Sequence, residues 1–139
     1  SIHFIASQTL SKQEFNQLYT IEINSEVIGF VNFYAYNRKE ISIFLGYVLA
    51  KQYRGHGLMH SVCYSLINEY FEKYNLKSIK TLIESHNIAS ERFVQKLNFK
   101  HSGKIKAEYT KLCPKYDICL YVLNQSDFTN LKNRNYGTR

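Results

Sequence analysis

The residues best suited to bind a ligand lie in one short segment, Gln52-Tyr53-Arg54-Gly55-His56-Gly57. The segment follows an apolar stretch predicted to be a strand and precedes an amphipathic stretch predicted to be a helix. Glycine lets the backbone turn tightly and approach a ligand closely. The first N–H groups of the helix and its positive dipole end would face the same place. This arrangement suits a phosphate-bearing ligand, although an ordinary glycine turn between a strand and a helix would have the same sequence.

Common nucleotide and metal motifs do not account for this segment. A Rossmann fingerprint requires a third glycine at the position of His60, and a P-loop requires Gly-Lys-Ser or Gly-Lys-Thr. His56 and His60 are four residues apart, but they lack a third ligand, and the chain has no Cys-x-x-Cys pair. We therefore expect a phosphate site of another kind and no metal.

Side chains that could transfer protons stand near the ends of predicted elements. Glu84 ends a predicted strand, and ligands commonly bind at strand ends beside a crossover connection. Asn87 is placed to cap the following helix, and Ser90 lies in its first turn. Asn87 could do no more than cap its helix, and Ser90 could do no more than make a local hydrogen bond. His86 and Tyr109 are further candidate cleft residues, to which the sequence assigns no role.

The hydrophobic pattern and the length predict one α/β domain over residues 1–139. A strand, a long helix and a second strand in succession imply two parallel strands joined by a right-handed crossover. Gly46, inside the first of these strands, indicates a bulge or a close backbone approach. Asn75 is expected to end the long helix, and Asn98 stands where the next helix needs a left-handed residue. The predicted elements are a helical region at 1–18, hairpin strands at 19–23 and 27–31, a strand at 41–49, a helix from 58, a strand at 78–84, a helix capped by Ser85 or Asn87, extended residues 99–108, a strand at 116–123 and a fraying polar tail at 124–139.

Composition limits the class of protein. The chain has 139 residues, of which 45% are hydrophobic, and a formal net charge of +7. No apolar run approaches the roughly 18 residues of a membrane span, and no secretory signal opens the chain. Three cysteines without regular spacing fit a reducing compartment, so we expect a cytoplasmic protein. The basic residues are scattered, which makes nucleic acid an improbable partner and leaves a basic surface that would attract a polyanionic cofactor.

Three ordered segments resemble the GNAT superfamily of N-acetyltransferases. The glycine segment matches Gln/Arg-x-x-Gly-x-Gly/Ala, which holds the pyrophosphate of acetyl-CoA in that family. Asn87-Ile88-Ala89-Ser90 with Lys96-Leu97-Asn98-Phe99 resembles Asn-x-x-Ser and Lys-Leu-Gly-Phe, with Asn98 in place of the glycine. Lys106-Ala107-Glu108-Tyr109, followed by Asp117 and Tyr121, looks like the RimJ/RimL-type group that acetylates the N-termini of ribosomal proteins.

The resemblance implies a single-domain GNAT-like fold. Its sheet is mixed and mostly antiparallel, splayed at a central parallel pair and flanked by helices. The strand and helix that open the family's fold have no counterpart here, so we expect either a truncated chain or a sheet completed by a partner. The tyrosine that protonates the departing thiolate in many members is replaced by Val94, as in the Rim-type group.

The resemblance also implies the site residues. Glu108 is the expected general base, acting directly or through a water, with Glu84 as its rival. Ser90 is the candidate acid for the thiolate and contacts the cofactor, and Asn87 binds the pantetheine arm or only caps its helix. The main chain of Tyr47, Val48 and Leu49 would contact the pantetheine and the thioester carbonyl. The pyrophosphate would lie on Arg54, Gly55, His56, Gly57, Leu58 and Met59.

We therefore expect an acetyl-CoA-dependent N-acetyltransferase that acts on a primary amine. The subgroup resemblance favours a protein N-terminal amine. A small amine such as a polyamine or aminoglycoside is the alternative, disfavoured by the positive net charge unless Glu84, Glu91 and Glu108 form an acidic cleft. A non-catalytic acetyl-CoA-binding module is a further alternative. No membrane partner is expected, and a homodimer is compatible with the sequence.

Overall fold

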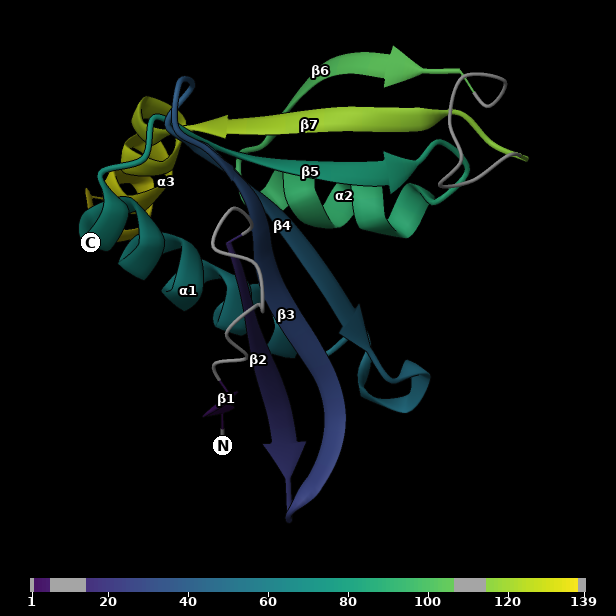
Figure 1. Ribbon diagram of the computed structural model, residues 1–139. Helices are drawn as coiled ribbons and strands as arrows, with labels where there is room; N and C mark the ends of the chain where they lie inside the picture. Colours follow the sequence, from purple (N-terminus) through teal and green to yellow (C-terminus); the bar gives the residue numbers. More distant parts are fainter. Residues whose placement is uncertain (1, 6–14, 107–114, 138–139) are drawn as a thin grey trace. The chain divides into compact units, whose positions relative to one another are not determined.

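The computed structural model describes residues 2–5, 15–106 and 115–137, with side chains described over 15–106 and 115–135. The chain folds as two compact units, Ser1–Leu76 and Lys77–Arg139. The single domain over 1–139 stays a prediction. Figure 1 shows the elements of both units.

The first unit is an antiparallel sheet followed by a short 3-10 turn and a long helix (Figure 1). Each of its strands pairs with the next one along the chain. The predicted hairpin is confirmed, because Asn24 and Ser25 form its turn with positive φ angles of 51° and 67°, as a two-residue hairpin turn requires. The elements are β1 (Ile2–Ile5), β2 (Asn16–Ile23), β3 (Glu26–Asn37), β4 (Ser42–Leu49), η1 (Lys51–Tyr53) and α1 (Leu58–Tyr74).

The predicted helical region at residues 1–18 is wrong wherever the structure describes it. Residues 2–5 form β1, and residues 16–18 belong to β2, while residues 6–14 lie outside the described part of the chain. Ile5 pairs with Leu18 across the two strands. Three apolar residues of that region, Ile2, Ile5 and Leu18, therefore lie in two paired strands, and strand pairing overrides a weak helical pattern.

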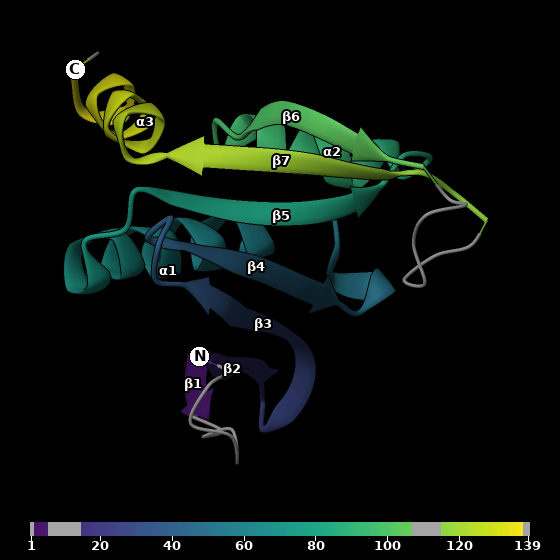
Figure 2. The ribbon, with the colours of Figure 1, turned by 45° about the horizontal axis from the view of Figure 1, so that its top comes forward.

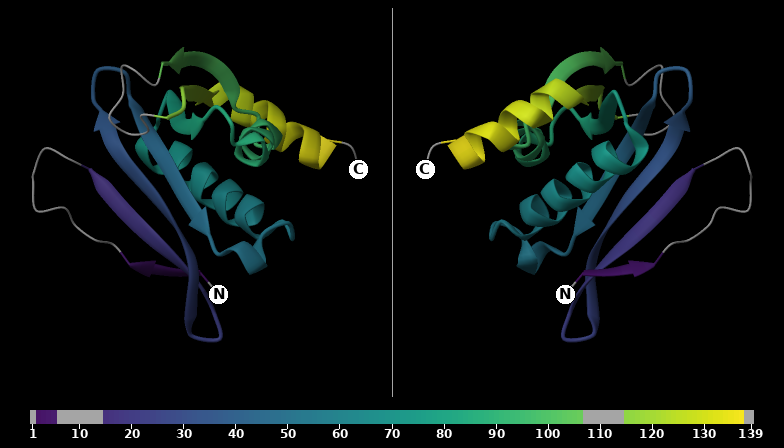
Figure 3. Two further views of the ribbon diagram at one scale, coloured as in Figure 1. Left: turned by 90° about the vertical axis from the view of Figure 1, so that its right-hand side faces the viewer. Right: turned by 90° about the vertical axis from the view of Figure 1, so that its left-hand side faces the viewer.

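Aromatic side chains hold α1 against its sheet. The rings of Phe33 and Tyr70 stack with centroids 3.7 Å apart and planes 13° apart, and both side chains are fully buried. Tyr19 meets both rings edge-on. Figure 3 shows α1 lying alongside β3 and β4. The amphipathic helix predicted from residue 58 is confirmed, and its buried residues are Met59, Val62, Cys63, Leu66, Ile67, Tyr70 and Phe71.

The Asn32 side chain on β3 occupies the space beside Gly46 on β4. Gly46 pairs with Asn32 in regular register, and a Cβ at Gly46 would collide with the Asn32 amide oxygen. The irregularity in this ladder lies between Tyr34 and Asn37 instead. The bulge predicted as one alternative at Gly46 is absent from its pairing with β3, and the atoms closest to a Cβ there belong to side chains and not to the backbone.

In the second unit, β7 lies between β5 and β6 and runs antiparallel to both. Figure 2 shows α2 against one face of these strands and α3 following β7. Asn98 has a φ of 72° directly after α2, as predicted, and Asn75 ends α1 with a φ of 49°. The parallel pair expected between residues 41–49 and 78–84 would join the two units and stays a prediction. The elements are β5 (Ser78–Glu84), α2 (Ile88–Lys96), β6 (Lys100–Ile105), β7 (Ile118–Asn124) and α3 (Gln125–Gly137).

The fraying tail predicted at residues 124–139 is wrong, because residues 125–137 form α3. Phe128 and Leu131 are buried, and residues three apart lie on one face of a helix. The Asp127 carboxylate accepts a hydrogen bond from the N–H of Asn124 at 3.4 Å, and the Asn98 amide donates to the Asp127 carbonyl at 2.7 Å. Two apolar residues in a polar segment are enough to anchor this helix to its unit.

Candidate functional site

The glycine segment forms an open cradle at the start of α1. Gly55 and Gly57 have φ angles of 83° and 75°, which favour glycine strongly. A Cβ added at either position would meet no other atom within 4 Å. These glycines are therefore required by backbone conformation and not by crowding, and the space beside them is open to a ligand.

The N-terminus of α1 has no side-chain cap. Gly57 stands at the capping position and has no side chain to accept a hydrogen bond from the first turn. Its carbonyl accepts from the N–H of Ser61 at 3.1 Å, which leaves the earlier N–H groups of the turn without helical acceptors. The start of α2 differs, because the Asn87 side chain caps it. At the start of α1 the free N–H donors and the positive end of the helix dipole face the open cradle. Such a site is suited to an anion.

Arg54 is tied to the end of the preceding strand. Its Nε donates to the carbonyl of Leu49 at 2.8 Å. Because only one of its five N–H donors is used in this contact, the remainder of the guanidinium is available for a second acceptor. The side chain is held beside the cradle, where a phosphate group would receive charge-assisted hydrogen bonds.

The hydrogen-bond alternation of the β3–β4 ladder decides which main-chain groups at the end of β4 face away from β3. The N–H of Ala50 donates to the carbonyl of Ile28 at 2.7 Å. In an antiparallel ladder, every second residue bonds to the same neighbour. The main chain of Val48 is therefore directed at β3, whereas the main chains of Tyr47 and Leu49 face the other way. Of the three residues predicted to contact the pantetheine, only Tyr47 and Leu49 therefore have main-chain groups that face away from β3.

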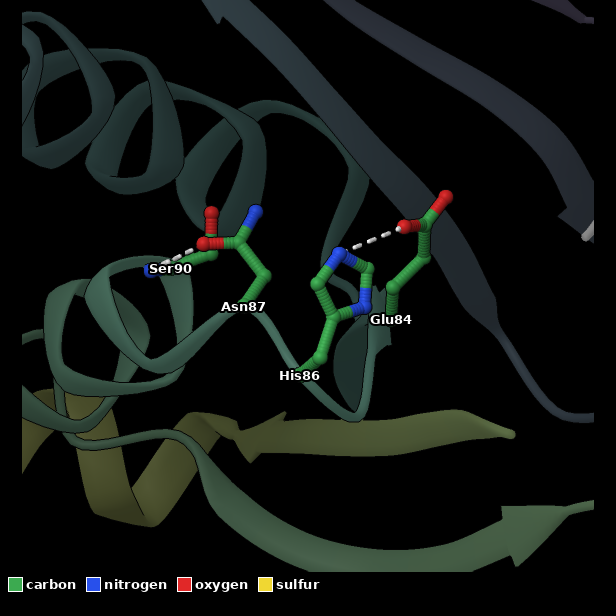
Figure 4. A network of polar contacts seen from close by, with 4 residues as sticks. All are labelled: Glu84, His86, Asn87 and Ser90. Atoms are coloured by element: carbon green, nitrogen blue, oxygen red, sulfur yellow. Dashed lines mark hydrogen bonds and ion pairs between the residues drawn. The ribbon is translucent and has the colours of Figure 1, made fainter. Parts of the chain in front are cut away.

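In the second unit, four polar residues gather where β5 ends and α2 begins (Figure 4). Glu84 and His86 form a pair, with 3.4 Å between the carboxylate Oε2 and the imidazole Nε2. Asn87 caps α2 by accepting a hydrogen bond from the N–H of Ser90 at 3.1 Å. The cap predicted for Asn87 is confirmed. Figure 4 shows the Ser90 hydroxyl and the Asn87 amide nitrogen on the same side of the loop.

The imidazole of His86 is held by a residue that the sequence patterns did not connect to it. Its ring stacks on Tyr116, with centroids 3.8 Å apart and planes 29° apart. The N–H of Ser85 donates to the carbonyl of Asp117 at 2.9 Å, which ties the loop after β5 to the segment before β7. The order of residues along the chain carries no signal for this contact, because it depends on the pairing of two strands.

The remaining predicted site residues differ in their surroundings. Glu108 and Tyr109 lie outside the described residues. His56 is exposed at the cradle, and Met59 is buried in the first turn of α1. Cys63 lies in the core, and burial raises the pKa of its thiol to about 12, so this side chain is no nucleophile near neutral pH.

Metal clusters and membrane spans are both absent from the part of the chain that the structure describes. Within it, no group of three or more His, Cys, Asp or Glu side chains is arranged to hold a metal ion. None of the described helices is both long enough and apolar enough to cross a membrane.

Comparison with known families identifies the class of protein. Residues 2–100 match the family model of the acetyltransferase (GNAT) domain. The chain therefore belongs to the GNAT family, and its α/β fold is GNAT-like. No curated protein sequence gives a significant match.

Solved structures of similar fold carry acetyltransferase names. An N-acetyltransferase from Staphylococcus aureus Mu50 is 26% identical, with a TM-score of 0.67, over 78% of this chain and 67% of that one. The ribosomal alpha-N-protein acetyltransferase RimL is 20% identical, with a TM-score of 0.70, over 78% and 60%. A variant of the spermidine N-acetyltransferase SpeG from Vibrio cholerae is 18% identical, with a TM-score of 0.73, over 87% and 71%. The chain spans 63% of the length of a further structure, a probable acetyltransferase.

The helix cap provides a test of the local geometry. Asn87→Ala removes the acceptor of the Ser90 N–H, and we expect the free energy of unfolding to fall by about 1 kcal/mol in urea denaturation. Ser90→Ala is the matched control, because the main-chain donor remains, and it should change stability by less than about 0.5 kcal/mol. Equal losses in both variants would contradict the cap assignment.

Proposed function

We propose that this protein transfers the acetyl group of acetyl-CoA to a primary amine. The observation that carries the proposal is the uncapped start of α1 beside Gly55 and Gly57, in a chain of the GNAT family. Its open backbone donors and the neighbouring Arg54 fit a pyrophosphate. We propose further that the protein acts in the cytoplasm.

The proposal assigns the cofactor contacts to particular residues. The segment from Arg54 to Met59 would bind the pyrophosphate through its N–H groups, with the guanidinium adding charge. The main chains of Tyr47 and Leu49, which face away from β3, would contact the pantetheine and the thioester carbonyl. A main-chain N–H at that carbonyl stabilises the oxyanion that forms during attack. Asn87 would add a contact through its amide nitrogen, because its carbonyl oxygen is used by the cap.

The proton transfers are assigned to Glu108 and Ser90. The amine nitrogen forms a bond to the carbonyl carbon, and the carbon–sulfur bond then breaks. Glu108, as general base, takes a proton from the nitrogen directly or through a water. The hydroxyl of Ser90 gives a proton to the departing thiolate and recovers one through solvent. Figure 4 shows that the Ser90 hydroxyl is not part of the Asn87 cap, so it is not committed to that bond.

For the acceptor, the resemblance of the Lys106–Tyr109 segment favours a protein N-terminal amine. The net charge of +7 supports this choice over a free polyamine, because like charges repel at long range. A small amine of the polyamine or aminoglycoside kind is the second candidate. It is favoured by one observation, the half-exposed carboxylate of Glu84 at the end of β5.

The reaction is tested by turnover on a panel of amines. We expect release of free CoA thiol with acetyl-CoA and at least one primary amine, and the panel would contain peptides with free N-termini, polyamines and aminoglycosides. Peptides should react faster than polyamines. Binding of acetyl-CoA without thiol release on any acceptor would overturn the enzyme proposal in favour of a non-catalytic binding module.

The role of Glu108 is tested by Glu108→Gln. Removal of a general base is expected to lower kcat by about 100-fold or more, while the affinity for acetyl-CoA in calorimetry stays nearly unchanged. A variant that retains full turnover would exclude Glu108 as the base.

The phosphate cradle is tested by Gly55→Val. A branched side chain at positive φ is strained and would occupy the open space of the cradle. We expect the dissociation constant for acetyl-CoA to rise at least about tenfold, which corresponds to about 1.4 kcal/mol. Gly103→Val is the matched control, because a Cβ there also meets nothing and its φ is not positive. Equal affinities of the two variants would refute the phosphate assignment.

A further inference from the structure

We propose that His86 positions Glu84 and that this pair accepts the proton by which an arriving ammonium group becomes the neutral amine. The inference rests on the proposed function and adds a step before the attack assigned to Glu108. His86 acts through Glu84 and is a positioning residue.

The loop that carries the pair is fixed by hydrogen bonds of the main chain. The N–H of Asn87 donates to the carbonyl of Glu84 at 2.9 Å, and the N–H of Ile88 donates to the carbonyl of His86 at 3.0 Å. The bond from Ser85 to Asp117 anchors the same loop to the segment before β7. The backbone of the pair is therefore set independently of its side chains.

Stacking fixes the plane of the imidazole. Tyr116 covers one face of the His86 ring, which limits rotation of that side chain. The Nε2 edge then faces the Glu84 carboxylate at 3.4 Å. Figure 4 shows one oxygen of Glu84 directed at His86 and the other directed away from it. His86 thus contacts one oxygen of the Glu84 carboxylate and leaves the second oxygen directed away from the imidazole, where a substrate could reach it.

The exposure of Glu84 and His86 indicates a functional role for the pair and not a structural one. The side chains of Glu84 and His86 are 45% and 48% exposed, so solvent and a substrate can reach both. An exposed contact between polar side chains of this kind contributes little to folding. The arrangement is therefore not needed to hold the loop, which its main-chain bonds already fix.

The proton step follows from the charge of the substrate. Amino groups of lysine type and α-amino groups have pKa values of roughly 10.4 and 8, so most arrive protonated at neutral pH. The second Glu84 oxygen, directed away from His86, offers a negatively charged acceptor that attracts an ammonium group. One N–H bond of the ammonium breaks, an O–H bond forms on Glu84, and the nitrogen keeps the electron pair for attack. Glu84 then loses this proton to water.

The experiment is a double-mutant cycle on kcat and KM, with the amine that gives the highest turnover in the wild-type protein. The variants are Glu84→Gln, His86→Phe and their combination. His86→Phe keeps a ring against Tyr116 and removes the nitrogen that faces Glu84. We expect it to lower kcat/KM for the amine at least about tenfold and to leave KM for acetyl-CoA unchanged. Since His86 acts through Glu84, the double variant should be no slower than Glu84→Gln within about twofold.

Two further variants separate positioning from packing. His86→Gln retains a side-chain N–H donor and should recover part of the activity lost in His86→Phe. His101→Phe on β6 is the matched control, because it replaces another exposed histidine that contacts a tyrosine ring, and it should keep wild-type turnover.

The outcomes distinguish this inference from the proposed function. Wild-type kinetics in His86→Phe, or losses that multiply in the double variant, would overturn the inference while wild-type turnover persists. A wild-type protein that releases no thiol with any amine would overturn the proposed function and this inference together.

Discussion

The buried stack of Phe33 on Tyr70 is the contact on which the first unit depends. It fixes α1 against the hairpin of β2 and β3, and Tyr19 closes the cluster edge-on. A helix held along its length has a fixed N-terminus, and the glycine cradle is that N-terminus. Burial of two large aromatic rings, each worth a few kcal/mol of transfer free energy, thus sets the place of the donors at the far end of the helix.

The same cluster shows how polar atoms are accommodated at the edge of an aromatic core. The hydroxyls of Tyr19 and Tyr70 are 2.7 Å apart, and each lies 2.9 Å from the side-chain oxygen of Gln17. Two hydroxyl hydrogens serve three contacts, so two of the contacts are hydrogen bonds at any moment. Burial raises the pKa of Tyr70 and of Tyr19, which keeps both hydroxyls protonated and the network neutral. The helix is thereby fixed in register without a buried charge.

The sequence predicted those parts of the fold that depend on local pattern. The amphipathic helix α1, the hairpin of β2 and β3 and the left-handed Asn98 are all encoded within a few residues, and the structure confirms them. The hairpin turn is one residue shorter than predicted, because Glu26 belongs to β3. The predictions were wrong in segments where a few apolar residues were compatible with two different secondary structures. Residues 2–5 pair with β2 and are not helical, and Phe128 with Leu131 anchors α3 in a segment whose polarity suggested a frayed tail. Tertiary contacts decide such segments, and no local pattern contains them.

The candidate site also has one part that depends on local sequence pattern and another that depends on contacts between distant residues. The cradle is built within a few consecutive residues, two glycines at positive φ and a helix start. A local pattern is therefore enough to indicate that an anion could bind there, as it could also indicate an ordinary glycine turn. The orientation of the Val48 main chain depends on the register between β3 and β4, and the stack of His86 on Tyr116 depends on the pairing of β5 with β7. Residues His86 and Tyr116, far apart in the chain, meet there only because Glu84 lies opposite Ile118. Strand register thus places Tyr116 against His86, a histidine without a role in any sequence pattern, while the His86 imidazole contacts the Glu84 carboxylate.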